Sequence, residues 1–261
     1  MFQLIQQQST GLYKTHQNKE YRGEIKMKKV TGFLTVSLIT GAVLYAPQAM
    51  FAEVSDSANS NNTVNFKSGE GDITTPVDPT DPSNPVVPTP IDIVDPTNPG
   101  TGNKGPLSID YASNIKFGEQ KIAGKDMIYS AMNKDPFVQV TDTRGTGAGW
   151  HLSAKASTFQ SADKTKTLKG AELSFKNGEV KATSTNSVSV EPKASDVVFS
   201  NTEAQPVFTA KAGEGRGTWL NVWSAAGEKN DNVQLKVLAG SADANTEYTA
   251  TILWELADAP K

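Results

Sequence analysis

The sequence predicts an all-β protein: a single β-sandwich or barrel-like domain of about ten short strands, preceded by a disordered, proline-rich linker. From Leu107 onward, short runs of alternating apolar and polar residues are separated by clusters of Gly, Asn, Asp and Lys. No segment shows the 3.6-residue period of an amphipathic helix. Many short strands with frequent turn signals are typical of a sandwich or barrel.

The chain contains no cysteine. Disulfides, a thiol nucleophile, cysteine-ligated metals and lipoprotein-type acylation are therefore excluded. An exported domain of this kind has to be stabilised by a hydrophobic core rather than by cross-links.

Residues 1–52 have the character of a leader. Residues 27–52 follow the plan of a secretory signal peptide, with Lys28 and Lys29 before an apolar stretch and Ala52 at the expected cleavage point. A membrane anchor is the alternative, but the apolar run is shorter than the roughly 20 residues that a span needs. Residues 1–26 are polar and without periodicity, and we expect translation to begin at Met27; a long basic start of the signal is the alternative.

The charge of the exported part is acidic. Of 25 basic and 28 acidic residues, six and two lie before residue 53, which leaves 19 and 26 and a net charge of −7. This balance argues against nucleic acid as a partner, since nucleic acid requires a basic footprint. It also argues against simple electrostatic adhesion to anionic wall polymers.

Two segments separate the leader from the domain. Residues 53–75 are rich in Ser, Asn and Gly, and we expect them to be disordered. Residues 76–106 hold nine of the 14 prolines. Because proline favours extended backbone, this segment predicts a polyproline-like, semi-rigid stalk with a rise of about 3.1 Å per residue. A ligand for an SH3-like domain is the alternative.

Residues 107–261 form the predicted β domain. The expected strands are residues 107–117, 127–129, 137–141, 149–156, 169–175, 187–190, 207–210, 218–223, 232–238 and 248–256.

Two of these strands share a short motif. Trp150 and Leu152 fall on one face of the fourth strand, and Trp254 and Leu256 fall on the apolar face of the last one. The pair of Trp-x-Leu motifs, the second close to the end of the sequence, resembles the WxL domain of Gram-positive surface proteins over residues 105–261. The resemblance implies non-covalent association with the Gram-positive cell wall, through peptidoglycan or through a co-expressed surface protein that binds WxL domains.

The motif residues can be read as core or as contact surface. All four side chains lie on apolar faces, where an aromatic ring buries roughly 150–250 Å². We therefore expect Trp150, Leu152, Trp254 and Leu256 to pack in the core.

A glycine-rich segment supplies the better surface candidates. In residues 213–223, Leu220 and Val222 share one face, which leaves Trp219, Asn221 and Trp223 on the other. If the first face is core, two tryptophans lie outside beside Arg216, in an arrangement that suits a sugar ring or a protein partner. The alternative is a central strand with both faces covered.

Arg144 lies in a second glycine-rich loop, residues 142–149. This loop lacks the Gly-Lys-Ser/Thr ending of a phosphate-binding loop, and we expect a long turn. Arg144 joins the four candidates above as an expected binding residue.

Catalysis receives little support from the sequence. His151 is the only histidine after the leader, and it lies on a polar strand face. No Gly-x-Ser-x-Gly motif occurs, and one histidine without cysteine does not make a metal cluster. We expect no catalytic residues, no metal and no cofactor; paired carboxylates for glycoside cleavage are the alternative.

The sequence predicts a secreted, non-enzymatic protein held at the cell surface. No sorting motif or apolar tail follows Leu256, so we expect non-covalent attachment and no membrane span in the mature chain. The alternative function is a carbohydrate-binding module for host or dietary glycans that uses Trp219 and Trp223. An extracellular hydrolase is the third.

Overall fold

The computed structural model describes residues 56–70, 72–84, 91–183 and 188–258. The expected signal peptide and the residues before it lie outside these ranges. One compact unit begins at Asn62, and it contains every strand described below.

The described residues form twelve strands and no helix. The strands are β1 (Leu107–Ala112), β2 (Met127–Ala131), β3 (Phe137–Asp142), β4 (Trp150–Ala156), β5 (Glu172–Phe175), β6 (Glu179–Ala182), β7 (Lys193–Ala194), β8 (Val197–Phe199), β9 (Gln205–Ala210), β10 (Gly217–Val222), β11 (Asn230–Val237) and β12 (Ile252–Ala257). The all-β class is confirmed. Three strands (β6, β7 and β8) were not expected. Of the strand expected at residues 187–190, the described residues 188–190 form only an isolated bridge at Val190.

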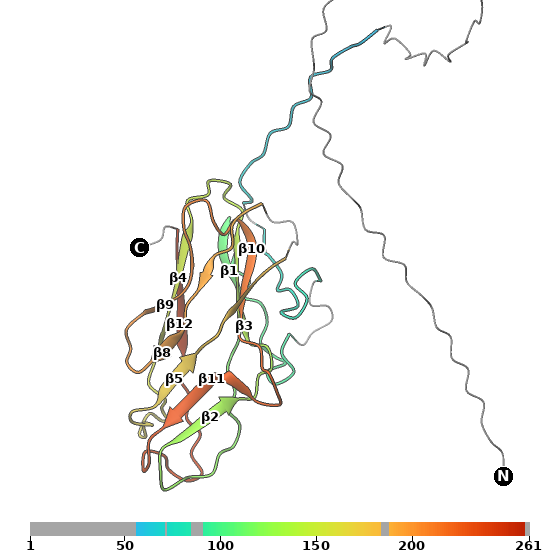
Figure 1. The fold of residues 1–261 in the computed structure, drawn as a ribbon. Helices are drawn as coiled ribbons and strands as arrows, with labels where there is room; N and C mark the ends of the chain where they lie inside the picture. Colours follow the sequence, from blue (N-terminus) through green and yellow to red (C-terminus); the bar gives the residue numbers. More distant parts are fainter. Residues whose placement is uncertain (1–55, 71, 85–90, 184–187, 259–261) are drawn as a thin grey trace, which may run out of the picture. The chain divides into compact units, whose positions relative to one another are not determined.

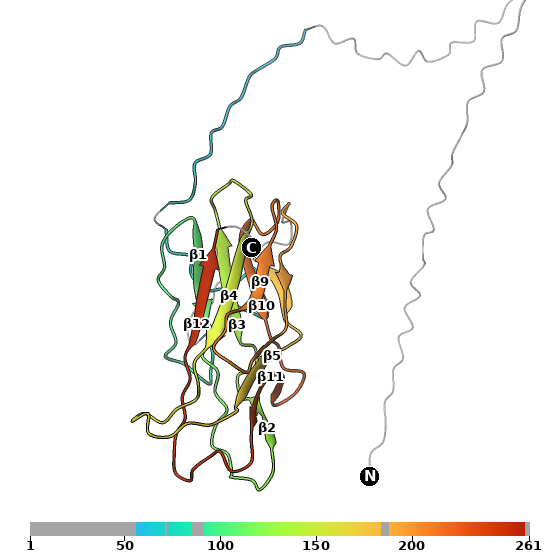
Figure 2. The same cartoon turned by 90° about the vertical axis from the view of Figure 1, so that its left-hand side faces the viewer.

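The strands form three sheets of four, and every strand pairing is antiparallel. The strap sheet has the order β1-β3-β10-β6, the motif sheet β12-β4-β9-β7 and the end sheet β2-β11-β5-β8. Figures 1 and 2 show the strap and motif sheets as two layers, with the end sheet below them.

One hydrophobic core lies between the layers. Val138, Val140 and Trp219 enter it from the strap sheet, and Trp150 and Phe208 from the motif sheet. The end sheet adds Leu173, Phe175 and Val233 to the same cluster. Alternation along the strands produces this arrangement: in β4 every second residue is buried and the residues between them are half-exposed.

The proline-rich segment is not a free stalk. Its described residues, 72–84 and 91–106, are called the strap, and several of them contact the outer face or the edge of the strap sheet. Val77 and Ile91 lie against a second cluster formed by Tyr111, Phe137, Leu220 and Val222. The expectation of a stalk was wrong because extended proline-rich backbone can also cover an apolar sheet face, which propensity alone does not reveal.

Buried polar groups hold the strap in place. Gln139 on β3 accepts a hydrogen bond from the Val77 amide at 3.0 Å and donates one to the Thr75 carbonyl at 3.1 Å. Gln139 also donates to Asp110 at 3.0 Å. Gln139 and Asp110 are both buried, and the backbone of residues 75 and 77 satisfies both ends of the Gln139 amide.

The strap also covers the free edge of β1. The Thr101 amide donates to the Asp110 carbonyl at 2.8 Å, and the Thr101 hydroxyl donates to the Ile109 carbonyl at 2.6 Å. Asn98 donates to the Ala112 carbonyl at 3.0 Å. These bonds close an edge that would otherwise be open to pairing with another strand.

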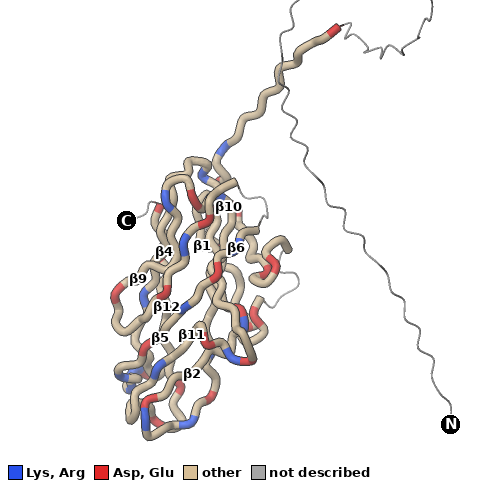
Figure 3. Tube along the Cα trace, in the orientation of Figure 1, with Lys and Arg blue, Asp and Glu red and all other residues tan. Residues whose placement is uncertain are grey.

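Charges of both signs are spread over the domain. Figure 3 shows Lys and Arg interspersed with Asp and Glu along the strands and loops of the β domain. No large single-sign region stands out in that view, so a specific contact fits this surface better than bulk electrostatic attraction.

Candidate functional site

The two Trp-x-Leu motifs are neighbours in one sheet. β4 and β12 pair antiparallel, with Leu152 opposite Leu256 and Trp254 opposite Ala154. Figure 2 shows the two strands side by side, with β12 at the rim. Trp150 and Leu152 are fully buried, whereas Trp254 and Leu256 are half-buried and pack against the core from the edge.

Trp150 joins the motif to a glycine-rich loop. Its indole N–H donates to the Gly215 carbonyl at 3.0 Å, and its ring meets Phe208 edge-on at 5.0 Å. Gly215 has a positive φ of 68°, and a Cβ there would lie 2.4 Å from the Ala210 Cβ. The loop therefore requires glycine at this position, and Trp150 fixes where the loop lies.

Trp254 joins the motif sheet to the end sheet. Its ring meets Phe175 of β5 edge-on at 6.4 Å, and Phe175 in turn meets Trp223 at 4.8 Å. Aromatic pairs in this geometry add stability beyond the area they bury. Trp254 thus contributes to the core from the rim of its sheet.

The expected outward placement of Trp219, Asn221 and Trp223 was wrong. Trp219 is 4% exposed, Trp223 is 1% exposed and Asn221 is fully buried. β10 is central in the strap sheet, between β3 and β6. Its other face, with Leu220 and Val222, is covered by the strap, so β10 has core on both sides. Apolar residues at successive positions of the strand are the sequence signal for this arrangement.

The side-chain amide of Asn221 and the indole N–H of Trp223 are unusual polar groups for a core. The amide nitrogen and oxygen of Asn221 and the indole nitrogen of Trp223 are buried without a hydrogen-bond partner among the described residues. Gly178 lies directly against them, since a Cβ there would be 2.2 Å from the Asn221 oxygen. These groups lie inside the core and offer no contact surface.

Arg144 is used within the fold. It donates to Asp142 through Nε at 3.0 Å and through Nη2 at 2.8 Å. The same guanidinium donates to the Gly149 carbonyl at 2.7 Å and the Asp258 carbonyl at 3.1 Å. The hydrogen bonds to Asp142 raise the pKa of Arg144. Arg144 therefore ties the start of β4 to the end of β12.

Arg216 remains exposed at the same end of the domain. Its guanidinium lies over Gly147, where a Cβ would come within 2.1 Å of Nη2. The Gly213 amide donates to the Gly147 carbonyl at 2.8 Å, so the two glycine-rich loops adjoin. Of the five expected binding residues, Arg216 alone is exposed.

The outer face of the motif sheet presents a set of residues that were not expected to bind. His151 and Glu255, the middle residues of the two motifs, lie on this face. The His151 Nδ1 lies 3.1 Å from the Thr209 hydroxyl, and Lys155 forms an ion pair with Glu255 at 3.2 Å. The alternation that buries Trp and Leu necessarily exposes the residue between them. The sequence could therefore have indicated His151 and Glu255 as surface residues.

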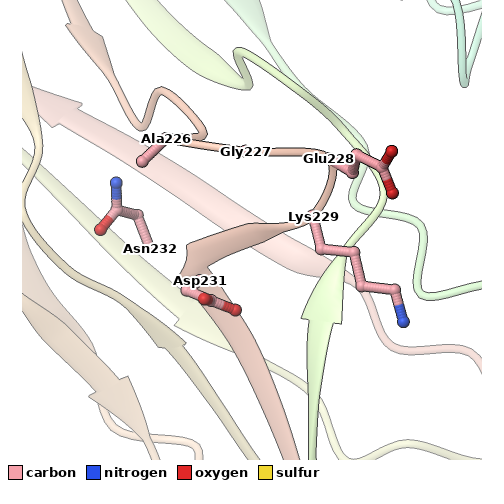
Figure 4. Close-up of a pocket in the computed structure, with 6 residues that line it drawn as sticks. All are labelled: Ala226, Gly227, Glu228, Lys229, Asp231 and Asn232. Carbon is pink, nitrogen blue, oxygen red and sulfur yellow. The ribbon is translucent and has the colours of Figure 1, made fainter.

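Among the described residues, no group of three or more His, Asp or Glu side chains could hold a metal ion. An open depression lies at the loop before β11, lined by Ala226, Gly227, Glu228, Lys229, Asp231 and Asn232. Figure 4 shows Glu228 and Lys229 pointing away from Asn232, so these side chains do not converge on one point. The described part of the chain contains no helix with the length and hydropathy that a membrane span requires.

Comparison with known proteins indicates the same family as the two Trp-x-Leu motifs. A family model for the WxL domain, described as surface cell wall-binding, matches residues 53–260. No curated protein and no solved structure matches the chain. The match covers the strap as well as the strands, and the family association places the protein at the cell wall. The chain therefore belongs to the WxL family of surface proteins, which carry a cell wall-binding domain.

Proposed function

We propose that the domain holds the protein on the Gram-positive cell wall non-covalently, through the outer face of the motif sheet, and that it binds peptidoglycan there. The observation that carries the proposal is the contrast between inner and outer residues of the motif strands. Trp150 and Leu152 are fully buried, while His151 and Glu255 lie on the open face. Residues that lie in the core cannot contact a wall polymer.

The chemistry of this face favours peptidoglycan over a protein receptor. The face offers an imidazole, hydroxyls, an ammonium and a carboxylate on His151, Ser153, Lys155, Thr209 and Glu255. Such groups suit the hydroxyls, amides and charged peptide stems of peptidoglycan. Protein-binding hot spots are enriched in aromatic anchors, and the large apolar side chain exposed on these two strands is Leu253.

The carbohydrate-binding alternative loses the residues on which it was based. Trp219 and Trp223 are in the core, and a glycan cannot stack on them in this structure. For metal-assisted hydrolysis, no group of three or more His, Asp or Glu side chains among the described residues could hold the ion.

The test is retention of the chain comprising residues 53–261 on purified sacculi. A variant with His151→Ala, Lys155→Ala and Glu255→Ala is compared with the matched change on the end sheet, Glu172→Ala with Lys236→Ala. The control removes an ion pair of similar kind, since Lys236 and Glu172 lie 3.4 Å apart. We expect the first variant to lose retention and the control to keep it.

Other results point elsewhere. Retention on whole cells but not on bare sacculi would identify a protein receptor instead of peptidoglycan. Equal retention of both variants would place the contact outside the motif sheet.

A further inference from the structure

The inference concerns the rim of the motif sheet. β12 pairs with β4 on one side, and no described strand pairs with its other side. β12 and β1 are the longest edge strands, at six residues each. The strap closes β1 with hydrogen bonds from Thr101 and Asn98, and no such bonds from described residues close β12.

The open edge of β12 also has apolar character. Ile252, Trp254 and Leu256 form a half-buried row that packs on the core, and Leu253 on the other side is 48% exposed. The charged residue within the strand is Glu255. A long, apolar edge with free backbone groups is a template for a further strand.

The same chain carries a segment that fits such an edge. Residues 63–67, called the arm, belong to no strand and precede the strap. They alternate as a strand would, with Val64 and Phe66 on one side and Asn65 and Lys67 on the other. Val64 is 72% exposed and Phe66 is 89% exposed. Two large apolar side chains in one exposed arm are a feature of interaction sites.

The arm repeats the pattern of the strand that β12 already pairs with. In β4, Leu152, Ser153, Ala154 and Lys155 lie opposite Leu256, Glu255, Trp254 and Leu253. Val64, Asn65, Phe66 and Lys67 offer the same order of apolar, polar, apolar and lysine. Lys155 lies opposite Leu253 and forms its ion pair with Glu255, so Lys67 in the equivalent register would approach Glu255 from the open side.

The direction of the arm argues for a second copy as the source. The Gly69 amide donates to the Thr143 carbonyl at 3.1 Å, and the neighbouring Arg144 holds the Asp258 carbonyl at the end of β12. An arm laid along its own β12 from this point would run in the same direction as β12. The pairing with the β4 register is antiparallel, as is every strand pairing in the domain, and this orientation is open to the arm of another molecule.

We propose that the arm of one copy adds as an antiparallel strand to the β12 edge of a second copy, with Val64 opposite Leu256 and Phe66 opposite Trp254. The added strand extends the motif sheet and buries the two exposed apolar side chains of the arm. The partner is a second copy of this chain, and the association does not depend on a wall ligand.

The test uses the chain comprising residues 53–261 and a variant with Val64→Asp and Phe66→Asp. The matched control is Ile93→Asp with Val188→Asp, because these residues are also exposed, at 81% and 101%, and make the same change in charge. Light scattering measures mass as a function of concentration. Amide exchange by NMR measures protection of the outward amides of β12.

We expect the unchanged chain and the control to form dimers or larger species as concentration rises, with slower exchange along β12. The arm variant should associate at least about 100-fold more weakly, because burial of two large side chains is lost. A peptide of residues 60–69 should then restore β12 protection in the arm variant, and the same peptide with both aspartates should not.

Three results would overturn the proposal. The first is an unchanged chain that stays monomeric at every concentration. The second is an arm variant that associates as strongly as the control. The third is association without any change in exchange along β12.

Discussion

The strap sheet and the motif sheet differ in what lies on their outer faces. The outer face of the strap sheet carries an apolar cluster, with Tyr111 stacked on Phe137 at 4.5 Å, beside the buried polar groups of Gln139 and Asp110, and the strap covers it. The outer face of the motif sheet carries His151, Lys155 and Glu255 and is open. The strap sheet is thus the middle one of three layers, covered on both faces. The motif sheet is covered on one face only and presents polar side chains on the other.

This difference teaches how to interpret the family motif. One face of the motif strands is open, and their Trp and Leu residues lie on the other. Residues that identify the family therefore stabilise the sheet, and the residue between them, His151 or Glu255, reaches the surface. The following predictions test that division, from the largest expected effect to the smallest.

Removal of the strap should have the largest effect. A chain of residues 105–261 exposes the outer cluster of Tyr111, Phe137, Leu220 and Val222. Loss of the contacts of the half-buried Val77 and Ile91 should cost about 1.5–3 kcal/mol together, at about half the 1.5–3 kcal/mol of a fully buried side chain. The hydrogen bonds from the strap to Gln139 and to the β1 edge are lost in addition. Urea unfolding measures the change, with a chain of residues 62–261 as the control. An unchanged unfolding midpoint for residues 105–261 would mean that the strap is not part of the folded core.

The two motif tryptophans should differ in their effect on stability. Trp150→Ala should lower the free energy of unfolding by about 3–5 kcal/mol, since the ring is fully buried. Trp254→Ala should cost about half as much, since Trp254 is half-buried at the rim. Thermal and urea unfolding of both variants give the comparison. Equal losses would contradict the assignment of β12 to the rim.

Polar substitutions should separate the two outer faces. Gln139→Ala removes the bonds to Val77 and Thr75 beneath the strap, and it should cost about 1–3 kcal/mol because buried partners are left unpaired. Ser153→Ala on the open face should change stability by less than about 0.5 kcal/mol. Urea unfolding of the two variants is the measurement, and similar costs would show that the faces are covered to the same extent.

The smallest effect concerns pH. Burial raises the pKa of Asp110, against the hydrogen bonds from Ser108, Thr141 and Gln139. The folded state therefore binds the proton of the Asp110 carboxyl more tightly than the unfolded state does. The stability that this protonated carboxyl contributes is lost as pH rises through its folded-state pKa. Asp110→Asn should remove that part of the decline. Unfolding at several pH values, from pH 4 to pH 7, compares the slopes, and identical slopes would show that Asp110 does not titrate differently on folding.

The sequence alone predicted which residues of β4 are buried, but it did not predict that the strap covers a sheet face. The alternation in residues 149–156 correctly placed Trp150 and Leu152 inward, because one face of β4 is open and the pattern is clean. β3 is buried at every position, so alternation carries no information about its outer face. Gln139 and Asp110 look like solvent-facing residues in sequence, and only the strap above them explains their burial.

The residues that we propose as the wall contact were missed for a related reason. Trp219 and Trp223 were predicted to be exposed because they lie opposite an apolar face, but a central strand can be apolar on both faces. His151 and Glu255 were not predicted to bind a ligand because polar residues on an exposed strand face are common. Their significance comes from the pairing of β4 with β12, which brings both motif centres to one face, and strand pairing between distant segments is not encoded locally.

The most direct measurement is sacculus retention and thermal stability measured together for one variant. The variant carries His151→Ala, Lys155→Ala and Glu255→Ala in the chain of residues 53–261. Since all three side chains are at least partly exposed, the account predicts an almost unchanged melting temperature with loss of retention. Full retention by this well-folded variant would contradict the claim that the open face of the motif sheet contacts the wall.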